Sequence, residues 1–219
     1  MPRMNRALIR LLIGGKPTMG IMLQRSLRGP VAKIISPIVK NLVKLGVSAN
    51  LISTIGGFGT IFCALYFFPK GEFFIGVIFV CLFVLSDLFD GAVARASRKG
   101  ENAWGALLDS TLDRASDAAI FFGGFLFFNQ TSDPLVVLFL IAVSASFLVS
   151  YIRARAESLS ITCTGGLAER SERLIIVLTA YGLHGLGVAY AMAIGLWIVT
   201  LISLFTVYQR LMIVYKAVK

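Results

Sequence analysis

Long apolar stretches separated by short polar connections dominate this chain after its first 50 residues. Stretches suitable for membrane-spanning helices lie near residues 51–68, 73–89, 115–128, 135–152, 172–186 and 188–208. Each is judged against the roughly 20 residues that cross a bilayer. The fifth is the weakest, because its strictly apolar part begins only at Leu174. The pattern predicts an all-α integral membrane protein with six transmembrane helices, while length alone also allows five.

A helical pattern of another kind precedes the first span. From residue 31 to residue 43 apolar positions recur at helical spacing, the lysines between them fall on other faces, and Gly46 suits a helix end. We interpret residues 31–45 as an amphipathic helix in the headgroup plane, although a buried helix of a soluble protein would show the same spacing.

The first 30 residues carry six basic residues and no acid. Their apolar core, from Ala7 to Ile13, is too short for a secretory signal and no small-residue cleavage site follows. We expect residues 1–30 to be a basic cytoplasmic arm attracted to anionic lipid. Residues 31–219 would form a single membrane domain, with the six spans running from about residue 51 to residue 210.

Composition supports the membrane interpretation. The chain has 219 residues, 57% of them hydrophobic and 15% charged, with a mean hydropathy of +0.84, outside the usual range of soluble domains. The net charge of +10 does not indicate nucleic-acid binding, because the six-span arrangement places 20 of the 21 Lys and Arg residues on one side. The positive-inside rule makes that side cytoplasmic. We therefore expect a multi-pass plasma-membrane protein with both termini in the cytoplasm.

Cysteine and histidine contribute little to this picture. Cys63, Cys81 and Cys163 have no ligand-like spacing, and two of them lie in apolar stretches, so disulfides are not expected. The single histidine, His184, is expected to be an ordinary residue of a short external connection.

Four aspartates lie within 27 residues of this apolar chain: Asp87, Asp90, Asp109 and Asp113. Spacings of three and four residues project each pair from one helical face. Both pairs lie about 24 Å from the far ends of their predicted helices, so they reach the same depth near the cytoplasmic edge. Four facing carboxylates could not all stay charged without a cation.

Oxygen ligands without histidine or thiolate favour a hard divalent cation, Mg²⁺ first and Mn²⁺ next. Four carboxylates suffice for two ions, and a metal pair suits phosphoryl chemistry. One of the acids could also deprotonate an alcohol nucleophile.

Small residues accompany the acids. Gly91, Ala94 and Gly105 remove side-chain bulk, which lets a helix or a flat ligand ring approach closely. Arg95 could bind a phosphate in bidentate fashion, although a basic residue at the cytoplasmic edge also follows from topology alone.

Together these positions form a recognisable motif. It is Asp87-x-x-Asp90-Gly91-x-x-Ala94-Arg95, nine residues, then Gly105-x-x-x-Asp109-x-x-x-Asp113. It resembles the defining motif of the CDP-alcohol phosphotransferases, integral membrane enzymes of phospholipid synthesis. All eight fixed positions agree, and the nine-residue connection is one longer than the commoner eight. The resemblance implies six helices around a polar cavity at the cytoplasmic side.

The resemblance also implies roles for individual residues. Asp87, Asp90, Asp109 and Asp113 would bind the metals, and Asp113 would act as the base. The residues expected to contact CDP-diacylglycerol are Asn50, Leu51, Ile52, Ser53, Gly91, Ala94, Arg95, Asn102 and Gly105. Around Asn50 the chain departs from the family pattern, since Ala49 replaces the usual proline and Ser53 stands where threonine is common.

The identity of the acceptor alcohol has to be inferred from charged residues outside the motif. Arg153 and Arg155 end the fourth span and Arg210 closes the sixth, which favours an anionic acceptor, although topology also explains basic residues there. Together with the segments 108–114 and 168–173, they resemble the family's actinobacterial phosphatidylinositol phosphate synthases. That resemblance implies transfer of a phosphatidyl group from CDP-diacylglycerol to inositol 1-phosphate, with release of CMP.

Other interpretations stay open. Glycerol 3-phosphate, giving phosphatidylglycerophosphate, or serine could be the acceptor. A cation transporter would also explain acids in a membrane, but it would not need the small residues and Arg95, and it should carry charge near the midplane. Asp117, one turn deeper than Asp113, is expected to have a structural or supporting role and not to ligate the metal. Small residues at Gly123–Gly124 and at Ala142 and Ser146 suit bundle packing and a homodimer equally well, and we expect a homodimer.

Overall fold

The computed structural model describes residues 36–39, 41–96, 103–163 and 165–219, and within these ranges the chain is helical with no β-strand. The elements are α3 (Ala49–Phe67), the 3₁₀ turn η1 (Phe68–Lys70), α4 (Phe73–Val84), α5 (Ser86–Ala96), α6 (Ala103–Gln130), α7 (Leu135–Ser158), α8 (Arg170–Gly185) and α9 (Ala191–Val218). The predicted all-α class is confirmed for this part of the chain.

Only part of the predicted amphipathic helix is visible. Residues 36–39 and 41–44 are helical, with Val39 buried and Ile38 and Leu45 exposed. The preceding positions, including the predicted arm 1–30, lie outside the described residues.

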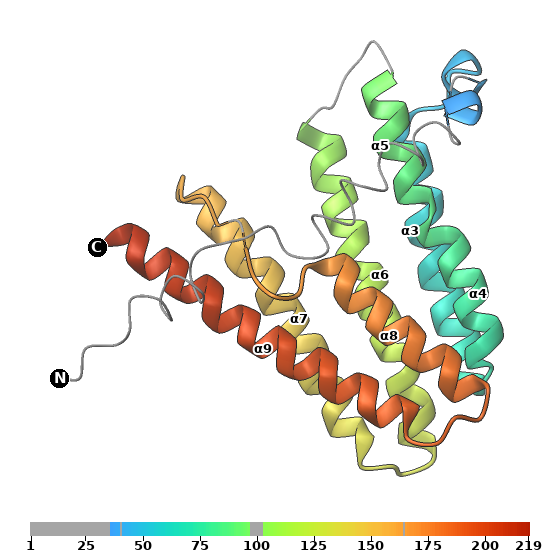
Figure 1. Cartoon of the computed structure of the whole chain (residues 1–219). Helices are drawn as coiled ribbons and strands as arrows, with labels where there is room; N and C mark the ends of the chain where they lie inside the picture. The colour runs from blue at the N-terminus through green and yellow to red at the C-terminus, as the bar shows by residue number, and fades with distance from the viewer. Residues whose placement is uncertain (1–35, 40, 97–102, 164) are drawn as a thin grey trace.

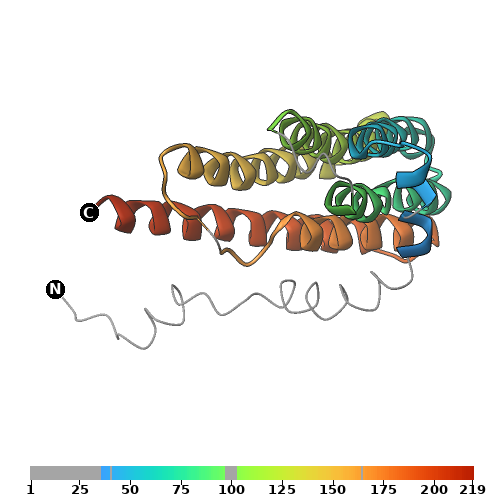
Figure 2. The same cartoon turned by 90° about the horizontal axis from the view of Figure 1, so that it is seen from above.

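The helices form a bundle of two layers, with α3, α6 and α7 in one and α4, α5, α8 and α9 in the other (Figure 2). Across the layers α3 packs on α4 and α5, and α7 packs on α9. The ends of α5, α7 and α9 and the starts of α6 and α8 all lie toward the upper side of the bundle in Figure 1. The acidic and arginine-rich segments of the sequence therefore gather on one side.

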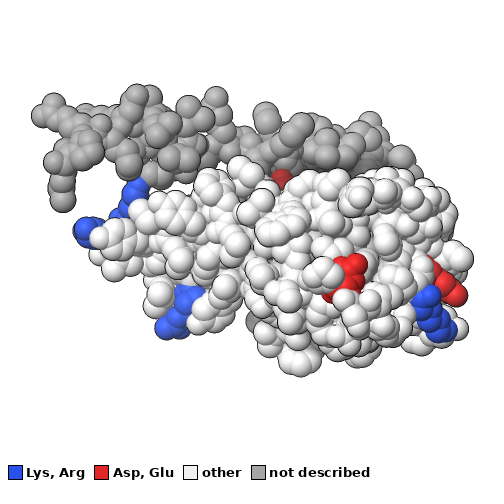
Figure 3. All heavy atoms as spheres, turned by 90° about the horizontal axis from the view of Figure 1, so that it is seen from below, with Lys and Arg blue, Asp and Glu red and all other residues white. Residues whose placement is uncertain are grey.

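Within the part of the chain that the structure describes, four helical segments are long and apolar enough to cross a membrane: Ala49–Lys70, Phe73–Ala96, Leu135–Ser158 and Ala191–Val218. The other two predicted spans differ from these for different reasons. α6 has 28 residues, but its first half carries the acids, whereas α8 has only 16 residues and begins with charged ones. The surface seen from below shows few charged side chains among the described residues (Figure 3).

Small residues allow close helix contacts within the chain. A Cβ at Gly123 would lie 2.5 Å from the carbonyl oxygen of Ala64, so glycine is needed where α6 approaches α3. Ala142 and Ser146 are also buried inside the bundle. These positions serve packing within one chain.

Aromatic side chains fill the end of the bundle opposite the acids. We call this the aromatic end: Phe68, Phe73, Phe127, Phe128 and Tyr181. The Phe73 ring centroid lies 5.6 Å from that of Phe68 and 5.2 Å from that of Tyr181, within the range of favourable ring pairs.

His184 joins this aromatic group. It lies in the last turn of α8, and its ring stands edge-on to Phe73 with centroids 5.0 Å apart. The expectation of an ordinary connection residue is therefore wrong, because His184 lies within α8 and its ring packs against the aromatic side chains.

Candidate functional site

Asp90 is held between α3 and α5. Its carboxylate is buried, with a relative exposure of 7%. The hydroxyl of Ser53 donates to Oδ2 at 2.6 Å, and the backbone N–H of Gly91 donates to Oδ1. Ser53 was expected to contact the nucleotide, but here it binds a predicted metal ligand. These donors fix the orientation of the carboxylate on the side of α5 that faces α3.

Asp109 and Asp113 lie one turn apart on the first half of α6. Both line one cavity together with Ser53 of α3 and Arg170 of α8. Asp109 is exposed, whereas the side chain of Asp113 is only 19% exposed. The predicted helical spacing thus places both acids on one face, toward a space that three other helices also border.

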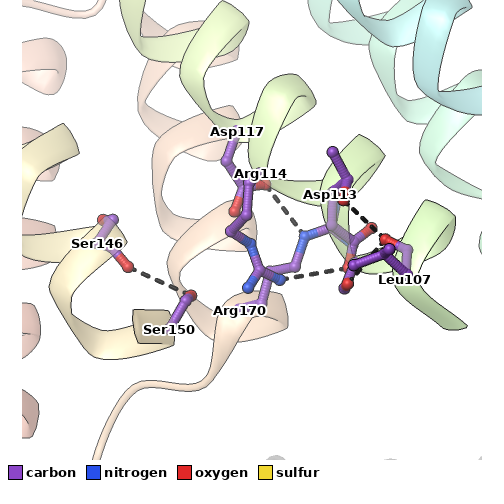
Figure 4. A network of polar contacts seen from close by, with 9 residues as sticks. Leu107, Asp113, Arg114, Asp117, Ser146, Ser150 and Arg170 are labelled. Carbon is purple, nitrogen blue, oxygen red and sulfur yellow. Dashed lines mark hydrogen bonds and ion pairs between the residues drawn. The ribbon is translucent and has the colours of Figure 1, made fainter. Parts of the chain in front are cut away.

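Arg170, the first residue of α8, bridges two acids of α6 (Figure 4). Its Nη1 lies 2.7 Å from Oδ1 of Asp113, and its Nε donates to Oδ1 of Asp117 at 3.1 Å. Arg114 adds a longer contact, from Nη2 to Oδ2 of Asp113 at 3.4 Å. The sequence did not predict these ion pairs. The only signal was the charged segment 168–173, which suggested a subgroup and not a contact.

The described carboxylates suit a hard cation by chemistry. Asp109 and Asp113 line the same cavity, and Asp90 is joined to it through Ser53. Asp87 lies on α5, but its side chain is outside the described part of the structure. Among the described side chains, no three acids, histidines or cysteines converge closely enough to form a metal site by themselves. The donor set fits Mg²⁺ or Mn²⁺.

Most residues expected to contact the nucleotide lie at the same end of the bundle. Asn50, Leu51 and Ile52 occupy the first turn of α3, which Ser48 caps by accepting from the Leu51 N–H at 3.2 Å. Gly105 lies in the first turn of α6, and Asn102 is outside the described residues.

On α5 the guanidinium of Arg95 lies beside Gly91, where an added Cβ would be 3.2 Å from Nη1. Ala94 precedes this exposed arginine on the same helix. Gly91 therefore allows Arg95 to lie close to the helix surface.

The three arginines expected to bind the acceptor differ in environment. Arg153 is exposed and pairs with Glu157 at 3.0 Å, and Arg155 is exposed and contacts Ser158. Arg210 has a relative exposure of only 3%; its Nε donates to the Gly165 carbonyl at 3.1 Å and its Nη1 to that of Val149 at 2.6 Å. None of the three is among the residues that line the cavity beside Asp113.

The connection before α8 is tied to α9. The backbone N–H groups of Leu167 and Ala168 donate to the side chains of Gln209 and Thr206, at 3.0 and 3.1 Å. A capping box between Glu169 and Glu172 then begins the helix. These contacts determine where α8 starts, and so they place Arg170 opposite α6.

Cys163 belongs to this connection. Burial raises the pKa of its thiol above the ordinary value, despite the opposing effect of Arg210. The thiol therefore stays protonated near neutral pH and is not an activated nucleophile.

The chain was compared with known proteins. Residues 46–208 match the family model described as CDP-alcohol phosphatidyltransferase. A phosphatidylinositol phosphate synthase of Streptomyces avermitilis is 40% identical over 210 residues, covering 91% of this chain and 86% of the relative.

Two solved structures of the Mycobacterium tuberculosis phosphatidylinositol phosphate synthase are similar. The one with CDP-DAG bound has a TM-score of 0.79 at 39% identity, covering 84% of this chain and 94% of that one. The one in complex with manganese and citrate has a TM-score of 0.76 at 38% identity, covering 82% and 88%.

Proposed function

Because this chain belongs to the CDP-alcohol phosphatidyltransferase family, we propose that it transfers the phosphatidyl group of CDP-diacylglycerol to inositol 1-phosphate. The products are phosphatidylinositol phosphate and CMP. The observation that carries this proposal is the cavity shared by Asp109, Asp113 and Ser53, with Ser53 binding Asp90. It joins three motif carboxylates within a chain that matches the family over residues 46–208.

In the proposed reaction an inositol hydroxyl oxygen attacks the phosphorus that bears diacylglycerol. A new P–O bond forms to the inositol oxygen while the P–O bond to CMP breaks. CMP is the leaving group, and it departs with the bridging oxygen as part of its phosphate. Asp113 accepts the hydroxyl proton. Its position supports this role, because it lines the cavity together with Asp109 and Ser53.

Asp87, Asp90, Asp109 and Asp113 would hold two divalent cations, Mg²⁺ or Mn²⁺. When bound, such ions neutralise a pyrophosphate and the charge that develops on a departing phosphate. The manganese complex of the M. tuberculosis relative supports divalent metal use in this family.

The remaining binding assignments are also proposals. Asn50, Leu51, Ile52, Gly91, Ala94, Arg95, Asn102 and Gly105 would contact CDP-diacylglycerol, with Ser53 acting through Asp90. Arg153, Arg155 and Arg210 would attract the acceptor phosphate. Arg210 could do so only with the part of its guanidinium that does not bind Gly165 and Val149.

We also propose the arrangement in the membrane. Six spans, with α6 and α8 completing the four apolar ones, would follow the amphipathic helix 31–45 and the basic arm 1–30 in one membrane domain. The active site and both termini would face the cytoplasm at the plasma membrane, and two copies would form a homodimer.

The test is CMP release by the purified protein in detergent, with CDP-diacylglycerol and Mg²⁺. Inositol 1-phosphate, free inositol, glycerol 3-phosphate and serine are compared, with Asp113→Asn as the control. Release only with inositol 1-phosphate, lost on substitution, is the expected result. Release with glycerol 3-phosphate instead would make the chain a phosphatidylglycerophosphate synthase and reject the acceptor assignment. No release with any acceptor would reject the proposed reaction.

A further inference from the structure

Asp117 is a buried acid that the proposed reaction does not use. It lies one turn beyond Asp113 on α6, and its side chain is only 12% exposed. The cavity that it lines is otherwise formed by the apolar residues Ile120, Phe121, Leu174 and Val177 and by Arg170 and Arg173. A carboxylate in such surroundings is costly unless it is paired. Asp117 therefore needs a cation partner at this position.

The cation in direct contact is Arg170. Its Nε, at the side edge of the guanidinium, donates to Asp117 at 3.1 Å, while Nη1 lies 2.7 Å from Oδ1 of Asp113. An arginine can bind one carboxylate side-on by using Nε together with an Nη group. Because Asp117 occupies the Nε edge, it opposes such side-on pairing between Arg170 and Asp113 (Figure 4).

We propose that Asp117 is a positioning residue that restrains Arg170 and so keeps Asp113 accessible to a divalent cation. This inference rests on the proposed metal role of Asp113. Without the charge of Asp117, the Nε edge is released and the guanidinium turns onto Asp113. Arg170 then competes with the metal for the same carboxylate. Asp117 acts through Arg170 and does not contact the ion.

Arg173 is the other cation that faces Asp117 from α8. Its Nη1 donates to the Ala168 carbonyl at 2.9 Å, which ties it to the start of its own helix. It therefore does not replace Arg170 as the group that links Asp117 to Asp113, and the prediction concerns Arg170 alone.

The experiment measures Mn²⁺ binding to the purified full-length protein by electron paramagnetic resonance of the free ion. It compares the wild type, Asp117→Asn, Arg170→Gln and the double variant. Removing a supporting partner of a metal ligand typically lowers affinity about 10- to 100-fold. We expect at least about a tenfold loss for Asp117→Asn, and no further loss when the same change is made in the Arg170→Gln background. Asp113→Asn serves as the reference for loss of a ligand.

Asp133→Asn is the matched control. It removes the same charge in the connection between α6 and α7, where Oδ1 of Asp133 accepts from the Leu135 N–H at 2.8 Å. Its Mn²⁺ affinity should equal that of the wild type. Thermal unfolding checks that each variant is folded, and Asp117→Ser replaces Asp117→Asn if the latter is not.

The outcomes separate the inference from the proposed function. Affinity that Asp113→Asn leaves unchanged would reject the metal site itself. Wild-type affinity in Asp117→Asn, with a loss in Asp113→Asn, would reject the inference and leave the metal site standing. A loss that persists in the Arg170→Gln background would mean that Asp117 acts without Arg170, which also overturns the inference.

Discussion

The two ends of the bundle are held together by different interactions. At the aromatic end, Phe68, Phe73 and Tyr181 have relative exposures of 0%, 1% and 0%. At the acidic end, formed by the last part of α5, the first half of α6 and the start of α8, Asp109 is exposed and Asp113 only partly buried. Rings in mutual contact close one end, whereas ion pairs and single hydrogen bonds border a cavity at the other.

This difference separates stability from chemistry. Ring burial is non-directional and stabilises α3, α4, α6 and α8 against one another through apolar area. Burying carboxylates and arginines at the acidic end costs desolvation free energy. That cost is offset only where each charge has a specific partner. Substitutions at the aromatic end should therefore lower stability, and substitutions at the acidic end should lower activity.

The largest effect is expected from Asp113→Asn. The amide keeps the shape of the side chain but cannot accept the hydroxyl proton and is a weaker metal ligand. Loss of a general base alone costs about 10²- to 10⁴-fold in rate, and we expect CMP release to fall by at least about a thousandfold. The thermal unfolding temperature should change little, because Arg170 keeps Asp117 as a partner.

Asp133→Asn is the control for that rate loss, since it removes an equal charge beyond the opposite end of α6, at a residue that does not line the cavity. It should retain wild-type CMP release. If Asp113→Asn unfolded the protein instead of inactivating it, the acidic end would be structural and the comparison between the two ends would be wrong.

Phe73→Ala should have the next largest effect, and on stability. The Phe73 ring contacts Phe68, Phe127 and Tyr181, with centroid distances of 5.6, 5.1 and 5.2 Å. Truncating a buried phenylalanine costs about 3–5 kcal/mol, from lost burial and the remaining cavity. We expect that loss in unfolding free energy, measured by denaturant titration in detergent.

The neighbouring residue provides a matched control. Phe74 is 42% exposed, so Phe74→Ala removes the same side chain from the outer surface of the same helix. Its effect should be under about 1 kcal/mol, in line with surface substitutions. Equal losses for both variants would show that the aromatic end is not a packed core.

Sequence patterns predicted the parts of this comparison that depend on local spacing. The i, i+4 spacing of Asp109 and Asp113 placed both acids on one face of α6. The apolar run 115–128 located only the second part of that helix, which begins at Ala103. The contacts of Arg170 and Ser53 were not predictable in this way. Each joins residues far apart in the chain, and the partner depends on how α8 and α3 pack against the acid helices.

The contacts of Arg210 were also not predictable from the sequence. A basic residue at the end of a span could face a ligand, solvent or the protein interior, and composition cannot distinguish these cases. Packing of α9 on α7 buries its guanidinium beside two backbone carbonyls. His184 likewise joined the aromatic end through tertiary packing, because α8 places its ring beside Phe73, a contact that the local sequence does not show.

Arg210→Gln tests a charge that lies on α9, outside the acidic end but on the same side of the bundle. Glutamine cannot reproduce both hydrogen bonds to Gly165 and Val149, and hydrogen bonds from charged groups contribute about 1.5–3 kcal/mol. We expect an unfolding free energy lower by about 2 kcal/mol and faster proteolysis of the connection 159–169. Arg155→Gln, on the exposed end of α7, should leave both quantities unchanged. A stable Arg210→Gln variant that fails only in acceptor binding would reject the structural role and show that Arg210 only binds ligand.

Tyr181→Phe gives the smallest expected effect and probes the aromatic end from within. The Tyr181 hydroxyl donates to the Ile120 carbonyl at 2.9 Å, at the level where α6 passes α8. The substitution keeps the ring contacts and removes one neutral hydrogen bond, which contributes about 1 kcal/mol. Denaturant titration should show that loss, while Tyr151→Phe, on a side chain 63% exposed, should show none. CMP release should stay at the wild-type rate in both variants. Since Ile120 lies on the same helix as Asp113 and Asp117, a large rate loss in Tyr181→Phe would mean that a change at the aromatic end reaches the carboxylates through α6, and the two ends would then have to be treated as one coupled unit.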